Sequence, residues 1–277
     1  MTRLVAADPA TPAGARSGLD IPTLPNLRDV GGHPTRDGGR VRVRLLYRST
    51  DLSRLDDDAA AALGRLGIRT VYDLRTIGER TAGPDRLPPG SAYVVADVLG
   101  DSRGMTPADF GKLFEDPAAA NEALGGGRAA MFFVGAYREF VRLDSARAGY
   151  RSLFADVAGG SSIPALFHCT TGKDRTGWAA AALLLFLGVP DEAVMEDYLL
   201  SGSRLQPMVQ PLIDEFAARG GNLDLLRPLV EVRPAYLESA LDEVRRLYKT
   251  IEGYFAEGLG LDAAARNALR GRLVEHP

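Results

Sequence analysis

The sequence lacks most of the features that mark secreted or membrane-spanning proteins. It has 277 residues and a single cysteine, Cys169, so no disulfide can form within the chain, which is typical of proteins in a reducing compartment. No apolar stretch reaches the length of about 20 residues that a transmembrane helix needs, and the N-terminal residues contain no signal-peptide core. We therefore expect a cytoplasmic protein without integral membrane association, although export by a route without a signal peptide would leave no mark in the sequence.

The sequence also lacks an excess of positive charge. The chain has 33 Lys and Arg residues against 36 Asp and Glu residues, a formal net charge of −3, and no run rich in Lys or Arg. A nucleic-acid-binding surface usually shows such a basic excess, so we expect no nucleic-acid partner. The apolar content of 45% and the charged content of 25% are those of an ordinary globular protein.

The first 20 residues differ in composition from the rest of the chain. Residues 1–20 are rich in alanine, proline, glycine and threonine, which predicts a disordered leader. From Ile21 onward, β-type runs alternate with helical patterns, and this predicts one α/β domain, residues 21–277, with a mainly parallel central sheet and helices on both faces. The predicted strands are residues 41–47, 68–74, 92–98 and 163–167.

Helical patterns dominate the second half of the domain. An early helix is predicted to begin at Ser53, with Asp56 three residues later, whereas residues 99–127 show no regular pattern. Residues 128–143 have a helical period, which continues in a second helix that ends at Gly159 and Gly160. The helices predicted after these are residues 178–188, 191–200, 204–219, 233–257 and 262–274. We treat residues 204–277 as a helical extension of the core.

The stretch IPALFHCTTGKDRTG, residues 163–177, organises the chain. Its first five residues predict a buried strand, and the apolar run after Gly177 is too long for a strand and predicts a buried helix. His168 and Cys169 follow the strand, and five residues separate the cysteine from Arg175. The sequence therefore predicts a strand, a tight loop and a helix N-terminus, with the cysteine at the base of the loop.

This arrangement is suited to binding a phosphate group. A loop that curls into a helix N-terminus points backbone N–H groups at one place, and the helix dipole adds positive potential there. Arg175 is expected to bind two phosphate oxygens with its planar guanidinium. The same field favours the thiolate of Cys169, to which the hydroxyl of Thr176 could donate. The other residues expected at the phosphate are Thr170, Thr171, Gly172 and Lys173.

Two motifs resemble those of a known family. The pattern His-Cys-x5-Arg-Thr resembles the active-site loop of the cysteine-dependent protein tyrosine phosphatases, and HCxxGKDRTG is similar to a bacterial branch with tyrosine, dual-specificity and phosphoinositide phosphatase activities. The opening N-x-R-D-x-G-G, which starts at Asn26, resembles a second motif of that branch. The resemblance covers residues 21–275 and implies a tyrosine-phosphatase-like α/β fold. It also implies that Asn26 and Arg28 help to bind phosphate, that Asp29 supports this segment, and that the helical extension lies over the pocket.

The resemblance implies a two-step hydrolysis of phosphomonoesters without a metal or another cofactor. Cys169 attacks phosphorus and forms a cysteinyl-phosphate, which water then hydrolyses, while the loop N–H groups and Arg175 stabilise the phosphoryl oxygens. His168 is expected to orient the loop and tune the thiolate rather than to transfer a proton. Lys173 resembles the lysine of the inositol-lipid phosphatases, and this resemblance implies that it recognises a second anion.

The general acid is not marked by a motif, because the chain has no Trp-Pro-Asp sequence. Asp174 is the first candidate, because a bound phosphate dianion beside it would favour its protonated form. Asp97 and Asp101, which follow a predicted strand, are the alternatives. A further charged group, for which pairing within the structure is the expected role, consists of Asp73, Arg75 and Glu79.

Other functions of the loop remain open at this stage. Rhodanese-type sulfurtransferases and arsenate reductases use a similar cysteine loop, but the former seldom need the Arg-Thr ending and the latter usually rely on further cysteines. A catalytically silent phosphate-binding module is the non-enzymatic alternative. Among phosphatases, we expect a protein tyrosine or dual-specificity phosphatase, with phosphoinositides or small sugar and nucleoside phosphates as the alternative substrates.

Overall fold

Five strands form the central sheet of the computed structural model, which describes residues 19, 21–104 and 116–277. In spatial order they are β1 (Arg28–Asp29), β3 (Leu46–Ser49), β6 (Ala165–His168), β4 (Thr70–Asp73) and β5 (Ala92–Val95). Only β1 runs antiparallel to its neighbour, and the other pairings in this sheet are parallel. This confirms the mainly parallel sheet predicted from the sequence. The predicted leader lies outside the described residues, apart from Leu19.

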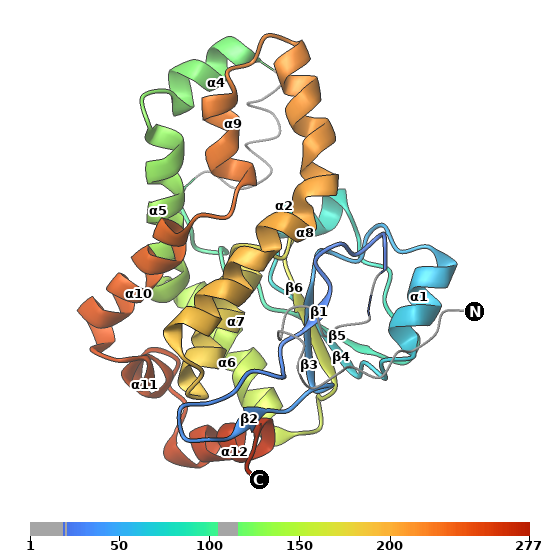
Figure 1. Cartoon of the computed structure of the whole chain (residues 1–277), viewed down its shortest axis with the longest axis vertical. Helices are drawn as coiled ribbons and strands as arrows, with labels where there is room; N and C mark the ends of the chain where they lie inside the picture. Colours follow the sequence, from blue (N-terminus) through green and yellow to red (C-terminus); the bar gives the residue numbers. More distant parts are fainter. Residues whose placement is uncertain (1–18, 20, 105–115) are drawn as a thin grey trace.

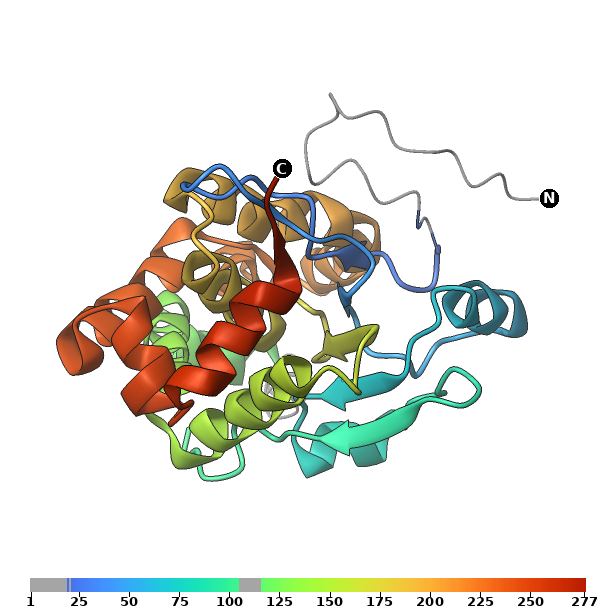
Figure 2. The same ribbon diagram turned by 90° about the horizontal axis from the view of Figure 1, so that it is seen from below.

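The sheet separates two hydrophobic clusters, because successive residues of a strand point to opposite faces. Figures 1 and 2 show a single helix, α1 (Asp57–Gly64), on one side and a thick layer of helices on the other. That layer includes α6 (Asp144–Gly159), α7 (Arg175–Phe186) and α12 (Ala263–Leu273). The strand residues in the larger cluster, with these helices, are Leu46, Tyr72, Ala165 and Phe167. Those that pack with α1 are Tyr47, Val71 and Leu166.

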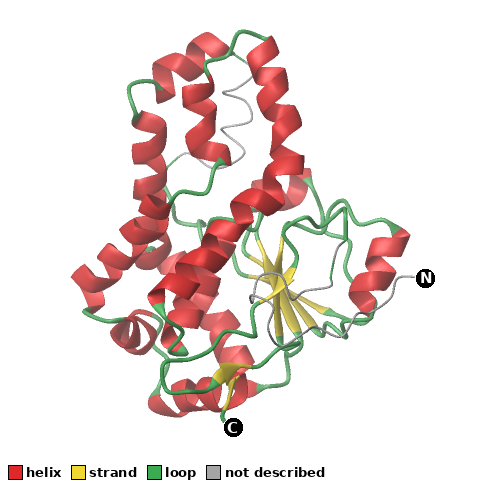
Figure 3. Ribbon diagram, viewed as in Figure 1, coloured by secondary structure: helices red, strands yellow, loops and turns green. Residues whose placement is uncertain are grey.

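A second group of helices extends beyond the sheet, at the top of Figure 3. Its members are α4 (Pro117–Leu124), α5 (Arg128–Arg142), α9 (Leu223–Val230) and the outer part of α8 (Asp191–Ala218). The chain is completed by α2 (Ile77–Ala82), α10 (Pro234–Tyr248), α11 (Ile251–Gly253), a π-helical turn (Tyr254–Gly258) and a two-stranded sheet of β2 (Arg40–Val41) and β7 (Val274–Glu275). Within the described part of the chain, no helix combines the length and the hydrophobicity needed to cross a membrane.

Several predicted element boundaries are wrong, for local reasons. The strand predicted over residues 41–47 is divided between β2 and β3, with Arg44 at a positive φ of 64° between them. The early helix begins after Asp56, whose side chain caps the N–H of Ala59, and not at Ser53. The helix predicted over residues 233–257 is interrupted at Lys249, which has a φ of 70°.

Helix α8 is continuous where the sequence predicted two helices, residues 191–200 and 204–219. Asp197, Ser201 and Leu205 follow one another at a spacing of four residues, so they lie on one face of the helix, and all three are buried. This buried face keeps the helix intact through the Ser-Gly sequence and through Pro207 and Pro211. One continuous helix therefore connects the sheet to the outer helical group.

Candidate active site

The residues from Cys169 to Arg175, which we call the phosphate loop, connect β6 to α7. Three successive carbonyl groups of this loop accept hydrogen bonds from other parts of the protein. The donors are the N–H of Asp51 to Thr170 (3.1 Å), Nδ2 of Asn26 to Thr171 (3.1 Å) and Nη2 of Arg48 to Gly172 (2.8 Å). The loop is thus held from outside by segments before β1, within β3 and after β3.

The directions of these carbonyl groups determine the directions of the N–H groups. In a trans peptide, the carbonyl of one residue and the N–H of the next point in opposite directions. Because the carbonyls of residues 170–172 point outward, the N–H groups of residues 171–173 point to the inner side of the loop. Gly172 is required for this path, since its φ is +67° and a Cβ would lie 2.1 Å from the carbonyl oxygen of Ser49. The loop therefore presents successive N–H groups in the manner of an anion-binding nest.

Cys169 and Arg175 lie at the two ends of this loop, with exposed fractions of 1% and 4%. The guanidinium of Arg175 is held by the carboxylate of Glu79 in α2, with Nη1 to Oε2 at 2.7 Å and Nη2 to Oε1 at 2.6 Å. Two parallel hydrogen bonds fix the plane of a guanidinium as well as its position. The sequence placed Glu79 in a group with Asp73 and Arg75, whereas the structure pairs it with Arg175.

Glu79 also connects α2 to the phosphate loop. Its side chain completes a capping box with Thr76 and accepts a hydrogen bond from the Thr170 hydroxyl. Burial raises the pKa of Glu79, but the hydrogen bond and the charge of Arg175 outweigh burial and lower the pKa from 4.5 to about 2. The stability that this carboxylate contributes is therefore present above about pH 4.5 and is lost as the pH falls toward 2. The Arg175–Glu79 pair is intact throughout the neutral range.

His168 belongs to a buried polar cluster behind Cys169. Its Nδ1 lies 3.2 Å from the carbonyl oxygen of Cys169, and its Nε2 lies 3.2 Å from Oδ2 of Asp85. This placement fits the predicted role of His168 in orienting the loop. The side chains of Asp73, Asp85 and His168 bring possible metal-ligand atoms within 4.8 Å of one another. However, Arg75 forms an ion pair with each carboxylate at 2.7 Å, and so supplies the positive charge that the buried carboxylates need.

The hydroxyl of Thr176 is buried and, within the described residues, has no hydrogen-bond partner. The hydrogen bond predicted from Thr176 to Cys169 is therefore not formed in this structure. Buried hydroxyl groups are rarely left unpaired, and a thiolate or a phosphate at the loop could accept from this one. The role of Thr176 stays a prediction.

Asp174 is the candidate acid that the structure places in the phosphate loop. Its Oδ1 accepts a hydrogen bond from the hydroxyl of Tyr137 at 2.9 Å, and Nζ of Lys173 lies 2.8 Å from the carboxylate. Lys173 is itself buried, with Nζ 4.8 Å from the centre of the Phe133 ring. The charge of Lys173 is therefore already paired with Asp174, and a second anion would share the ammonium group with this carboxylate.

Asp97 and Asp101 make their contacts elsewhere. Oδ2 of Asp97 lies 3.8 Å from Nη1 of Arg80. Asp101 accepts hydrogen bonds at the start of α6, and the one from the Ser145 hydroxyl lowers the pKa of Asp101. Within the described residues, neither side chain contacts the phosphate loop or lines its pocket. Of the three candidates, only Asp174 belongs to the phosphate loop, and its role as the general acid stays a prediction.

Arg28 does not face the pocket, which corrects the prediction that it reaches substrate. Its side chain is 1% exposed, and its Nε donates to Oδ1 of Asp197 at 2.9 Å. Nη1 of Arg28 donates to Oδ1 of Asn26, whose amide holds the carbonyl of Thr171. Asn26 and Arg28 therefore support the loop from behind and do not present their side chains to a phosphate. Asp29 supports this segment as predicted, because it accepts from the N–H of Gly31.

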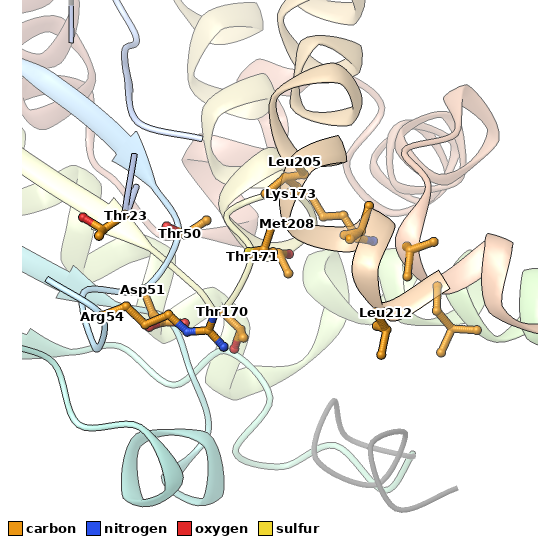
Figure 4. A pocket seen from close by; sticks show the side chains of 13 residues that line it. Thr23, Thr50, Asp51, Arg54, Thr170, Thr171, Lys173, Leu205, Met208 and Leu212 are labelled. Atoms are coloured by element: carbon orange, nitrogen blue, oxygen red, sulfur yellow. The ribbon is translucent and has the colours of Figure 1, made fainter. Parts of the chain in front are cut away.

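A pocket of about 360 Å³ opens beside the phosphate loop (Figure 4). Thr170, Thr171 and Lys173 line it on the side of the loop. Its apolar wall comes from the predicted helical extension, through Leu205, Met208, Val209 and Leu212 of α8 and Leu229 and Val230 of α9.

Sequence reasoning missed Asp51 and Arg54, which also line this pocket. Both follow β3, which runs parallel to β6 with Ser49 opposite His168. Because ligands bind at the carboxyl ends of parallel strands, the polar residues after β3 could have been found from this rule.

Comparisons with known proteins are consistent with this geometry. The chain matches the tyrosine phosphatase family over residues 19–275. It is 32% identical, over 96% of its length and 93% of the relative's, to a Cupriavidus necator protein provisionally named a tyrosine-protein phosphatase. It is 29% identical, over 92% of its length and 98% of the relative's, to the triple specificity protein phosphatase PtpB of Mycobacterium tuberculosis. A tyrosine-protein phosphatase of Nostoc commune is 30% identical over 60% of this chain and 51% of its own length. The chain therefore belongs to the tyrosine phosphatase family.

Proposed function

We propose that the protein hydrolyses phosphomonoesters through a cysteinyl-phosphate formed on Cys169, with phosphotyrosine in proteins as its main substrate. One observation carries the proposal: three successive carbonyl groups of the phosphate loop are held from outside, so the following N–H groups point inward beside the cysteine. Arg175, fixed by Glu79, adds a charged group at the same loop. The loop thus combines a nucleophile with donors for the phosphoryl oxygens.

In the first step, the Cys169 thiolate attacks phosphorus and the bond from phosphorus to the leaving oxygen breaks. That oxygen takes a proton from Asp174, while the inward N–H groups and Arg175 stabilise the remaining phosphoryl oxygens. In the second step, water attacks the cysteinyl-phosphate and the phosphorus–sulfur bond breaks. The Asp174 carboxylate takes the proton of the water, and the thiolate and inorganic phosphate are released.

The pocket favours an aryl phosphate. Its apolar wall, formed by α8 and α9, offers a surface on which the ring of a phosphotyrosine would pack. A phosphoserine side chain is shorter and would leave most of this wall uncovered. The relative PtpB is named for triple specificity, so we extend the proposal to a second, slower activity on other phosphorylated residues.

We further propose that the partners are phosphorylated proteins and not nucleic acids, because the net charge is −3 and the sequence has no run rich in Lys or Arg. A cysteine that must stay reduced to act as a nucleophile favours a cytoplasmic location.

A panel of substrates tests the function. Steady-state rates should be measured with a phosphotyrosine peptide, a phosphoserine peptide of the same sequence, inositol phosphates and sugar phosphates. We expect kcat/KM for the phosphotyrosine peptide to exceed that for the phosphoserine peptide by about tenfold or more, because even one additional methylene group in an apolar pocket changes kcat/KM by about 10- to 200-fold. Faster hydrolysis of the inositol or sugar phosphates would move the protein to another substrate class.

The acid can be tested separately by changing the leaving group. If Asp174 donates the proton, Asp174→Asn should slow the hydrolysis of an alkyl phosphate by roughly 100-fold or more and of an activated aryl phosphate by much less. The alkaline limb of the pH–rate profile should also flatten. Asp97→Asn is the matched control, since its carboxylate lies beside Arg80. The same signature in the control and a normal profile for Asp174→Asn would assign the proton to another group.

A further inference from the structure

Two arginines lie directly opposite each other on neighbouring strands behind the phosphate loop. Arg28 of β1 and Arg48 of β3 are partners in the antiparallel register, and each has only 1% of its surface exposed. Like charges directly opposite each other across a pair of strands are destabilising, and burial in a low-dielectric interior strengthens the repulsion. This pair of cations therefore needs an explanation beyond the stability of the sheet.

One carboxylate lies between the two arginines. Asp197 of α8 accepts from Nε of Arg28 at 2.9 Å and from Nη1 of Arg48 at 2.8 Å. The Ser201 hydroxyl, one turn further along α8, accepts from Nη2 of Arg28 at 3.0 Å. Within the described residues, no other carboxylate is bonded to either guanidinium. We call Arg28, Arg48 and Asp197 the arginine cluster, and its formal charge is +1.

The arginine cluster is joined to the phosphate loop. Nη2 of Arg48 donates to the carbonyl of Gly172 at 2.8 Å, and Nε of Arg48 has no hydrogen-bond partner within the described residues. Burial and the charge of Arg28 lower the pKa of Arg48 to about 10, which still leaves it charged at neutral pH. The charge of Asp197 acts in the opposite direction on that pKa, and a thiolate at Cys169 would add to this effect.

The charged side chains of the phosphate loop itself are paired. Arg175 is paired with Glu79, and Lys173 is paired with Asp174. Burial raises the pKa values of the three tyrosines closest to these groups, which keeps their hydroxyls neutral: Tyr137, Tyr150 and Tyr198. His168 lies beside Asp85, and the charge of His33, when present, adds to the effect of the arginines on Asp197. The excess positive charge on this side of the loop therefore comes from the arginine cluster.

We propose that Arg48 is a positioning residue of the phosphatase reaction, and that the arginine cluster places one positive charge behind the phosphate loop to stabilise the Cys169 thiolate and the bound phosphate dianion. The inference rests on the proposed function, and it assigns this role to residues that do not touch the substrate. Arg48 acts in two ways: it orients the Gly172 carbonyl, and it supplies charge from the side of the loop opposite to the pocket.

The test measures the reactivity of Cys169, which is unambiguous because the chain has no other cysteine. The rate of alkylation by iodoacetamide is measured as a function of pH in the wild type and in Arg48→Met. The midpoint, which is the pH at which this rate is half of its maximum, is then compared between the two proteins. Arg48→Met should raise the midpoint by about one pH unit, as expected for the loss of a nearby opposite charge. It should also weaken the protection of Cys169 by inorganic phosphate by about tenfold.

Three matched variants separate charge from structure. Arg48→Lys keeps the charge without the planar fork, and should keep the midpoint near the wild-type value. Arg28→Met removes a charge from the arginine cluster and the hydrogen bond to Asn26 but leaves the bond from Arg48 to Gly172, and should also raise the midpoint. Asp197→Asn removes the negative charge, so it should lower the midpoint. Circular dichroism checks that each variant is folded. If Asp197→Asn does not fold, the comparison of Arg48→Met with Arg48→Lys alone tests whether the charge sets the midpoint.

An unchanged midpoint in folded Arg48→Met, or equal shifts in Arg48→Met and Arg48→Lys, would overturn the inference. A shift of the midpoint in Asp197→Asn in the same direction as in Arg48→Met would also overturn it. A damaged loop would shift the midpoint in one direction whichever charge is removed, whereas an electrostatic effect reverses with the sign of that charge. Turnover of phosphotyrosine peptide by the wild type tests the proposed function separately. If the wild type hydrolyses no phosphate ester but the variants show the predicted midpoints, the proposed function is wrong. The inferred effect of the arginine cluster on the Cys169 thiolate would still hold.

Discussion

Replacing Cys169 by serine is expected to lower the turnover of a phosphotyrosine peptide by roughly 10⁴- to 10⁶-fold, the range seen when an enzyme loses its covalent nucleophile. A serine hydroxyl is only a weak nucleophile at neutral pH, because almost none of it is ionised there. The phosphate site itself should remain, because most of its donors are backbone N–H groups of a loop whose carbonyl groups accept hydrogen bonds from Asn26, Arg48 and Asp51. The measurements are the single-turnover rate and the affinity for phosphate or vanadate by calorimetry.

Two results would contradict this expectation. Turnover of a clean Cys169→Ser preparation at more than a tenth of the wild-type rate would rule out a cysteinyl-phosphate. Loss of phosphate binding together with turnover would mean that the substitution damaged the loop, and not only the chemistry. Trapping of ³²P on the wild-type protein, absent in Cys169→Ala, identifies the intermediate directly.

The second large effect is expected at Arg175. Arg175→Lys should lower kcat by roughly 10³-fold, because one ammonium cannot replace a planar group that holds two phosphoryl oxygens in the transition state. The effect should be mainly on kcat, since the charge of the site is preserved. Glu79→Gln is the companion variant: it leaves Arg175 in place but removes the carboxylate that fixes its plane at 2.7 and 2.6 Å. We expect roughly a 10- to 100-fold loss of kcat, as for a catalytic group displaced by about 1 Å.

The order of these two effects is the critical result. A larger loss for Glu79→Gln than for Arg175→Lys would mean that Glu79 takes part in the chemistry itself. Thermal unfolding should show whether both variants are still folded under the assay conditions. This control is needed because removing one partner of a buried ion pair typically lowers the free energy of unfolding by about 3–5 kcal/mol. Arg233→Lys, in an exposed pair with Glu231, is the control for a general effect of replacing arginine.

The central part of the fold follows from the sequence because its signals are local. The apolar strand before His168, the loop glycine and the long apolar helix after Gly177 all lie within residues 163–188, and the structure has β6 and α7 in these places. The caps at Asp56 and Asp262 are similarly local, although only the second was predicted as a helix start. The continuous α8 could not be predicted in this way, since it depends on Asp197 and Ser201 meeting arginines from distant strands.

The same distinction applies to the site. Cys169, Arg175 and Asp174 were found because they share one motif, and their catalytic roles stay predictions that the variants above test. Glu79, Arg48 and Asp85 were missed as site residues, because each reaches the loop through the fold and not through the sequence. Arg28 was assigned to the substrate because it belongs to a motif, and only its burial against Asp197 shows that it lies behind the loop.

The arginine cluster has a consequence for the way the chain acquires its structure during synthesis. Asp197 is made 169 residues after Arg28 and 149 residues after Arg48. At about 5–20 residues per second, the ribosome needs roughly 7 to 34 s to cover that distance. During this interval β1 and β3 carry two arginines without their carboxylate, so the nascent sheet cannot bury them at low free-energy cost. The phosphate loop is completed before Asp197 emerges, but we expect it to reach its final geometry only after α8 has been made. A nascent chain halted before residue 197 should therefore fail to retain phosphate, although it already contains every residue of the loop motif.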